Sequence, residues 1–179
     1  MSRGRADSMP AVSEQREPAE RAALRPERPE RSLRPSQREA DERPDATMTV
    51  LVYSDDFDTR QQVKLAVGRR PAPDVPRVQW LECATGPGVI AALDKGGVDV
   101  AILDGEAAPT GGLGIARQVK DEIYQCPPIL VLTGRVADNW LAAWSRAEAA
   151  VPHPLDPIVL AGAVADLMRR RRAELTVRT

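Results

Sequence analysis

Short apolar runs rich in Val, Ile and Leu recur along the chain after residue 48, and each is followed by a longer segment of mixed polarity. Runs that are apolar at nearly every position are typical of strands buried on both faces of a parallel sheet. The pattern therefore predicts five strands. They are expected at residues 49–53, 78–83, 98–103 and 129–132, with a weaker strand at 149–151.

The segments between the predicted strands carry apolar residues three or four positions apart, as one face of a helix requires. Strict alternation of strand and helix predicts a (βα)5 chain, folded as a three-layer α/β sandwich around a central five-stranded parallel sheet. In such a fold, function is expected beyond the carboxyl ends of the strands. The residues that define the helical faces are Val63, Ala66 and Val67; Val89, Ile90 and Leu93; Leu113, Ala116 and Val119; Trp140, Leu141 and Trp144; and Val159, Leu160, Val164 and Leu167.

Composition changes sharply near Met48. Residues 1–47 contain 10 Arg, 10 Asp or Glu, 6 Pro and no aromatic residue, so they offer little apolar surface to offset the entropy cost of ordering. We therefore predict a disordered N-terminal segment at 1–47, a folded domain at 48–172 and a C-terminal tail at 173–179. The alternative is that the physiological protein starts at Met48.

Charge and cysteine content narrow the class of protein. The 179 residues carry a formal net charge of -1, which gives no general attraction to nucleic acid or to an anionic membrane. No apolar run approaches the roughly 18 residues of a membrane helix, and the N-terminus lacks a signal peptide's apolar segment. Cys83 and Cys126 are too few for a disulfide framework or a zinc site, and we expect both to be small buried residues. These features predict a soluble, cytoplasmic protein without membrane insertion.

Polar side chains follow four of the five predicted strands and should meet at one edge of the sheet. Clustered carboxylates repel each other, so they are tolerated mainly where a cation holds them together, and a hard cation such as Mg²⁺ fits them. A carboxylate beside such an ion could accept a phosphoryl group, whose oxygens a hydroxyl and a cation would stabilise. The residues are Ser54, Asp55 and Asp56 after the first strand, Asp104 after the third, Thr133 after the fourth and His153 after the fifth.

Four motifs in this order resemble the receiver domain of bacterial two-component response regulators. They are TVLVYSDDFDTR, VDVAILDGEAAPTGGLGIARQVKD, PPILVLTG and AAVPHPLDPIVL, and the resemblance runs from Thr49 to about Arg170. It implies a flavodoxin-like (βα)5 fold. It also implies a phosphorylatable Asp after the third strand, two acids after the first, a Thr or Ser after the fourth, and a Lys-Pro pair after the fifth.

The resemblance assigns an expected role to each strand-end residue. Asp104 takes the place of the phosphoacceptor, and Asp55 with Asp104 would be the ligands of Mg²⁺. Thr133 takes the place of the switch hydroxyl and His153 that of the Lys. Pro154 matches the proline after that Lys, which often follows a cis peptide bond.

Two positions depart from the family's pattern. Ser54 stands where the family usually has an acid, so one carboxylate near the metal position is missing. His153 replaces an always-charged Lys, so an ion pair to a phosphoryl group would depend on pH. These departures make the chain an atypical receiver. Because only residues 173–179 follow the last predicted helix, we expect it to stand alone, without enzymatic activity. It would act as a signalling or adaptor module that binds another protein, either switched by phosphorylation at Asp104 or, if that switching has been lost, as a constitutive adaptor. A histidine kinase is a candidate partner.

Several of these residues have ordinary structural interpretations as well. Asp55 could be a helix N-cap, and Thr133 a β-favouring residue at a strand end. His153 could be a structural residue between two prolines. Trp140 and Trp144, one helical turn apart, could form a partner-binding surface or pack into the core.

Two other functions remain open from the sequence. The same fold could bind a flavin or a nucleotide, although the glycine-rich residues 111–114 lack the spacing of a dinucleotide or P-loop motif and are interpreted as a turn that opens a helix. A transcriptional regulator could contact DNA through the arginine run 169–172. A solvated helix end is the default interpretation of that run, so nucleic acid binding is not favoured.

Overall fold

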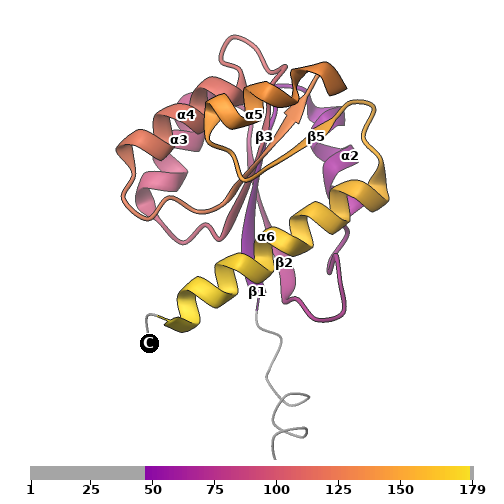
Figure 1. Ribbon diagram of the computed structural model, residues 1–179, viewed down its shortest axis with the longest axis vertical. Coiled ribbons are helices and arrows are strands. Elements are labelled where there is room, and N and C mark those ends of the chain that lie inside the picture. The colour runs from indigo at the N-terminus through magenta and orange to yellow at the C-terminus, as the bar shows by residue number, and fades with distance from the viewer. Residues whose placement is uncertain (1–46, 178–179) are drawn as a thin grey trace, which may run out of the picture. The chain divides into compact units, whose positions relative to one another are not determined.

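The five predicted strands form one parallel sheet in the order β2-β1-β3-β4-β5. The structure, a computed structural model, describes residues 47–177 (Figure 1). Residues 1–46 of the predicted disordered segment lie outside the described residues. The strands are β1 (Thr47–Tyr53), β2 (Arg77–Cys83), β3 (Val100–Asp104), β4 (Ile129–Thr133) and β5 (Ala149–Pro152).

Five α-helices cover the two faces of the sheet, which confirms the three-layer (βα)5 architecture (Figure 1). One core cluster joins the sheet to α2 and α6, and a second joins its other face to α3, α4 and α5. Residues 173–177 of the predicted tail continue the last helix. The helices are α2 (Phe57–Val67), α3 (Gly86–Lys95), α4 (Gly112–Glu122), α5 (Asn139–Ser145) and α6 (Pro157–Val177), with a short 3-10 helix η1 (Val136–Asp138) before α5.

Alternate residues of each central strand point to opposite faces, as the strand period of two requires. Val52 packs in the core beneath α2 and α6, whereas Leu51 and Tyr53 pack beneath α3, α4 and α5. All five residues of β3 are buried, and so are all five of β4. Each fully buried Leu, Ile or Val side chain contributes about 1.5–3 kcal/mol relative to exposure. The central strands can therefore hold their carboxyl ends in place rigidly.

The register of the sheet determines which strand ends become neighbours. Tyr53 of β1 lies beside Leu103 of β3, and Asp104 lies beside Leu132 of β4. The next residue along β1, Ser54, is therefore brought next to Asp104. Both edge strands, β2 and β5, are less buried than the three strands between them.

Both cysteines are half-buried, so the expectation that they are small buried residues is wrong in degree. Cys83 ends β2, and Cys126 precedes β4; each packs against the core cluster beneath α3, α4 and α5. Burial raises the pKa of both thiols above the ordinary value of 9.0. Both side chains are therefore protonated thiols at neutral pH.

The arginine run near the end of α6 is largely occupied by contacts within the domain. Arg169 makes a bidentate pair with Asp74, with its Nε 2.7 Å from Oδ2 and its Nη2 2.8 Å from Oδ1. The Nε of Arg171 lies 3.9 Å from Oδ1 of Asp99. Arg172 donates to the carbonyl oxygen of Asp74 at 3.4 Å. Acids of the domain thus compensate much of this positive charge, and the DNA-binding alternative is not favoured.

The Arg169–Asp74 pair leads to a prediction about acid titration. Hydrogen bonds from the Arg169 guanidinium lower the pKa of Asp74 from 3.8 to about 2. Because the pKa is lower in the folded state, the pair's contribution to stability is complete above pH about 4 and is lost as pH falls through about 2. We expect carboxyl ¹³C NMR to place the Asp74 midpoint near 2, and Arg169→Gln to move it back toward 4. A midpoint near 4 in the unaltered protein would contradict this pairing.

Candidate functional site

The strand-end residues predicted to converge lie together at the carboxyl edge of the sheet. The Oγ of Ser54 donates a hydrogen bond to Oδ2 of Asp104 at 2.8 Å. The backbone N–H of Gly105 donates to the carbonyl oxygen of Leu132 at 2.8 Å, and that of His153 to the carbonyl oxygen of Thr133 at 2.8 Å. These bonds join the ends of β1, β3, β4 and β5 in sequence.

Asp104 is the last residue of β3, and only 4% of it is exposed. Its Oδ2 accepts from Ser54, and its Oδ1 accepts from the backbone N–H of Glu106 at 3.0 Å. Each carboxylate oxygen can accept more than one hydrogen bond. The carboxylate is thus held by two donors and still has free lone pairs, as a nucleophile or a metal ligand needs.

The turn after β1 separates the roles of three consecutive polar residues. Ser54 is fully buried, and its Oγ also accepts from the backbone N–H of Asp56 at 3.1 Å. Asp56 is the N-cap of α2 and accepts from the N–H groups of Asp58 and Thr59. A hydrogen bond from the Thr59 hydroxyl is the main cause that lowers the pKa of Asp56. Since Asp56 fills the cap position, capping does not account for Asp55, whose side chain is exposed.

Tyr53 anchors the loop between β3 and α4, a role that the sequence analysis did not assign. Its hydroxyl donates to the carbonyl oxygen of Thr110 at 2.6 Å. Burial raises the pKa of Tyr53, and the negative charges of Asp55 and Asp104 raise it further. The hydroxyl therefore stays protonated and remains a donor. The only sequence signal was an aromatic side chain at the last position of β1.

Glycines allow the same loop to close tightly around Asp104. A Cβ on Gly112 would lie 2.6 Å from the carbonyl oxygen of Asp104, and a Cβ on Gly105 would lie 2.6 Å from that of Leu132. Gly111 is the N-cap of α4, as the interpretation of residues 111–114 as a turn and helix start predicted. The Ala108–Pro109 peptide bond in this loop is cis.

Thr133 and His153 lie at the neighbouring strand ends. Thr133 is 1% exposed, and its Oγ1 donates to the carbonyl oxygen of Arg135 at 3.3 Å. The peptide bond between His153 and Pro154 is cis, as the resemblance implied. Within residues 47–177, the hydrogen bonds include none made by the His153 imidazole. The His153 residue is half-buried.

The donor set at this edge fits a weakly held divalent cation. Among residues 47–177 no group of three or more His, Cys, Asp or Glu side chains could hold a metal ion. Mg²⁺ is commonly held by one or two carboxylates together with several waters and phosphate oxygens. Asp55 and Asp104 could supply those two carboxylates, and both lie close enough to Tyr53 to raise the pKa of its hydroxyl. Ser54 adds a neutral oxygen rather than a third charge.

Trp140 and Trp144 both project from α5 toward solvent, with 66% and 50% of each residue exposed. Ala142, between them in the helix, is a buried apolar residue that packs α5 against the core, and Ser145 at the end of the helix is buried as well. Arg117 of α4 donates to the carbonyl oxygen of Trp144 at 3.0 Å and helps to hold the helix end. Packing of the two indoles in the core is thus excluded, and they form an exposed aromatic pair.

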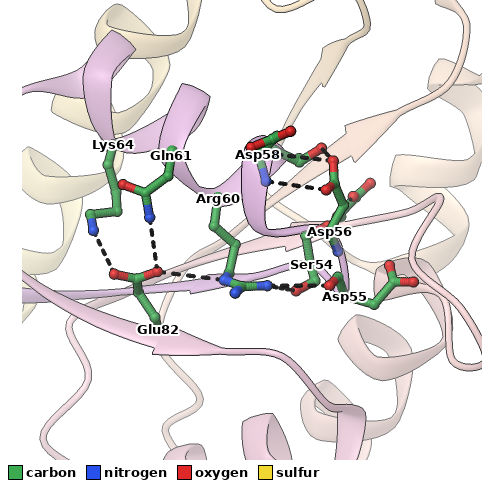
Figure 2. A network of polar contacts seen from close by, with 10 residues as sticks. Ser54, Asp55, Asp56, Asp58, Arg60, Gln61, Lys64 and Glu82 are labelled. Atoms are coloured by element: carbon green, nitrogen blue, oxygen red, sulfur yellow. Dashed lines mark hydrogen bonds and ion pairs between the residues drawn. The ribbon is translucent and has the colours of Figure 1, made fainter.

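A second residue missed by the sequence analysis is Arg60 of α2. Figure 2 shows its guanidinium between Glu82 at the end of β2 and the turn that contains Ser54 and Asp55. Its charge gave no distinctive sequence signal, because arginine on the first turns of a helix is ordinarily solvated.

In the part of the chain that the structure describes, no helix has the length and apolar character needed to cross a membrane.

Comparison with known proteins adds relatives at two levels of similarity. No family model matches the chain. Two uncharacterized response regulatory proteins of Mycobacterium tuberculosis, from strains CDC 1551 / Oshkosh and ATCC 25618 / H37Rv, are each 62% identical to it over 122 residues, which is 68% of this chain and 92% of each relative.

Solved structures with the same fold are more distant in sequence. The receiver domain of Francisella response regulator 1452 is 16% identical, with a TM-score of 0.59, over 69% of this chain and 98% of that one. The chemotaxis protein CheY4 of Vibrio cholerae is 21% identical, with a TM-score of 0.55, over 68% of this chain and 99% of that one.

Proposed function

Because this chain belongs to the response regulators and has the receiver-domain fold, we propose that it is a signalling module that accepts a phosphoryl group on Asp104 and acts by binding another protein. Receiver domains of this family are in general signalling modules rather than enzymes, and they interact with histidine kinases and other proteins. They also generally bind Mg²⁺ at the phosphorylation site.

The observation that carries the proposal is the buried carboxylate of Asp104 at the end of the central strand β3, 2.8 Å from the Ser54 hydroxyl. In the proposed reaction, an Asp104 carboxylate oxygen attacks the phosphorus of a kinase phosphohistidine. The phosphorus–nitrogen bond breaks, and its electron pair leaves with the imidazole. A cation held by Asp55 and Asp104 would neutralise the charge on the phosphoryl oxygens.

Thr133 and His153 are proposed to respond to the phosphoryl group. The Thr133 hydroxyl now donates to the carbonyl oxygen of Arg135, which immediately precedes η1 and α5. A phosphoryl oxygen is a stronger acceptor than a carbonyl, so the hydroxyl would turn toward it and release Arg135. His153 in its protonated form would add a positive charge on the β5 side.

The exposed pair Trp140 and Trp144 is the proposed partner-binding surface. Tryptophan is enriched at the energetic centres of protein interfaces because it buries a large area at little entropy cost. The pair lies only a few residues beyond Arg135, so release of the Thr133–Arg135 bond would shift the population of conformations at this surface.

The flavin or nucleotide alternative is not favoured. Within the glycine-rich residues 111–114, the backbone of Gly111 packs closely against the backbone of Gly105. A Cβ on Gly111 would lie 2.8 Å from the carbonyl oxygen of Gly105. This close approach leaves no phosphate-sized space between Gly111 and Gly105. A protein that purifies with a yellow colour would restore the flavin alternative.

The proposal predicts a saturable response to a phosphoryl mimic. The full chain is titrated with beryllofluoride at millimolar Mg²⁺ while tryptophan fluorescence and amide NMR shifts are recorded. We expect shifts at Asp104, Thr133 and Trp140 that are absent in Asp104→Asn, which keeps the size of the side chain and an oxygen acceptor for Ser54. Equal responses of both proteins, or no response of the unaltered one, would refute phosphorylation at Asp104.

A further inference from the structure

The side chain of Arg60 reaches back from α2 across the carboxyl ends of β1 and β2. Its Nη1 donates to the carbonyl oxygen of Ser54 at 2.6 Å and to that of Asp55 at 3.4 Å. Its Nε lies 3.5 Å from Oε2 of Glu82, and its guanidinium carbon lies 5.6 Å from the centre of the Phe57 ring. Figure 2 shows this side chain bridging the two strand ends.

Arg60 is unusually buried for a charged helix residue, with only 12% of its side chain exposed. Burying a cation is unfavourable unless it is paired and hydrogen-bonded. The partners here are two backbone carbonyls on one side and Glu82 on the other. A planar guanidinium presents five donors in a rigid fork and can reach both sides at once, whereas a lysine ammonium is a single point on a flexible chain.

The two carbonyls that Arg60 contacts belong to the two peptide units on either side of the Asp55 Cα. Each peptide unit is planar, so the backbone at Asp55 has only two soft dihedral angles, and these set the relative orientation of the two units. Holding both carbonyls with one guanidinium therefore restrains the direction in which the Asp55 side chain leaves the backbone. Ser54, whose carbonyl oxygen is one of the two, points its hydroxyl to Asp104 at 2.8 Å.

Glu82 of β2 helps to hold Arg60 in this position through the ion pair to its Nε. Its Oε1 also accepts from Nζ of Lys64 at 2.5 Å, and Gln61 donates to its Oε2 at 3.4 Å. The hydrogen bond and charge of Lys64, and to a smaller extent those of Arg60, lower the pKa of Glu82, so it stays ionised at neutral pH. Lys64 therefore shares Glu82 with Arg60 but makes no hydrogen bond to the turn after β1 among the described residues.

We infer that Arg60 is a positioning residue of the site: by holding the peptide units on both sides of Asp55, it restrains the backbone from which the Asp55 carboxylate and the Ser54 hydroxyl project. The inference rests on the proposed function only for its metal-binding readout. A group that orients a metal ligand commonly changes metal affinity by about tenfold or more when it is removed. Arg60 acts on Asp55 and Ser54 through their backbone and does not itself contact a ligand.

The test compares Arg60→Gln with Lys64→Met in the full chain, because both changes remove a contact to Glu82 and only the first removes the contacts to the turn after β1. The first readout is the amide NMR shift of Asp56, which donates to Ser54, and of Glu106, which donates to Asp104. The second readout is the Mg²⁺ dissociation constant from calorimetry. We expect both amides to shift and the Mg²⁺ dissociation constant to rise about tenfold in Arg60→Gln, with neither change in Lys64→Met.

Each outcome decides for or against the inference. Unchanged Asp56 and Glu106 amides in a folded Arg60→Gln would overturn it, and so would equal effects of the two substitutions. If the unaltered protein does not bind Mg²⁺, the metal part of the proposed function fails, and the amide shifts alone decide on Arg60. If Arg60→Gln does not fold, Arg60→Lys is the variant that tests the inference, because lysine keeps the positive charge but lacks the planar guanidinium. We then expect a partial shift of the Asp56 and Glu106 amides.

Discussion

Replacing Gly112 with alanine is expected to destabilise the domain by about 3 kcal/mol, at the upper end of the usual range for overpacking. The new Cβ would lie 2.6 Å from the carbonyl oxygen of Asp104 and 2.8 Å from the carbonyl carbon of Leu103. Both are backbone atoms of β3, a strand buried along its whole length, so neither can move aside easily. The first turn of α4 would have to shift away from the site instead.

The same substitution two residues later is a matched control. Gly114 lies in the same helix, and a Cβ built there meets nothing within 4 Å. Alanine is favoured over glycine in a helix by about 1 kcal/mol, so Gly114→Ala should be neutral or stabilising. Urea denaturation of both variants gives the comparison. A Gly112→Ala protein as stable as Gly114→Ala would show that α4 does not press on the end of β3.

The Gly112 substitution should also disturb the chemistry of the site. Because the clash falls on the backbone of Asp104 itself, the carboxylate should move relative to Ser54 and Glu106. We therefore expect any beryllofluoride response of the unaltered protein to be lost in Gly112→Ala and kept in Gly114→Ala.

Replacing Ser54 with aspartate is expected to increase Mg²⁺ affinity about tenfold or more, because carboxylate charge is the main determinant of affinity for hard cations. The Ser54 hydroxyl lies 2.8 Å from Asp104 Oδ2, so the new carboxylate would join Asp55 and Asp104 in one cluster. Without Mg²⁺, the buried like charges repel each other and should destabilise the protein by about 1–3 kcal/mol. Mg²⁺ at about 100 times its dissociation constant would restore about 2.7 kcal/mol.

Thermal unfolding with and without Mg²⁺ measures both effects, and calorimetry gives the affinity directly. Ser54→Asn is the matched control, since it has nearly the size of aspartate but adds no charge, and it should show little Mg²⁺ dependence. If Ser54→Asp and Ser54→Asn responded to Mg²⁺ alike, the position of Ser54 would not be part of a metal site.

The hydrophobic pattern predicted the architecture because a strand that is buried on both faces is apolar at nearly every position. The predicted runs at 98–103 and 129–132 became the interior strands β3 and β4, and the weaker run at 149–151 became the edge strand β5. The predicted first and last residues of the strands agree less exactly with the structure. The third strand was expected at 98–103 and spans Val100–Asp104, so Asp104 is its last residue rather than the one after it.

The site was predicted in part, since strand ends follow from the pattern and side-chain contacts do not. The sequence placed Ser54, Asp104 and Thr133 at one edge, but it left Asp55 open between cap and ligand until Asp56 was seen to fill the cap. The helical spacing of Trp140 and Trp144 could not tell which face of α5 meets the core. Ala142 meets the core, and both tryptophans lie exposed on the rest of the helix.

By itself, then, the sequence determined the order of strands and helices, the layers that they form and the edge at which the polar residues gather, because these depend on local periodicity and on burial. Only the tertiary structure decided the hydrogen bonds of Tyr53 to Thr110 and of Ser54 to Asp104, and the ion pair of Arg60 with Glu82. The first two join residues 57 and 50 positions apart in the chain, and Arg60 and Glu82 belong to different elements. Such contacts depend on the exact register of neighbouring strands and on the path of each side chain, which no local pattern of polarity records.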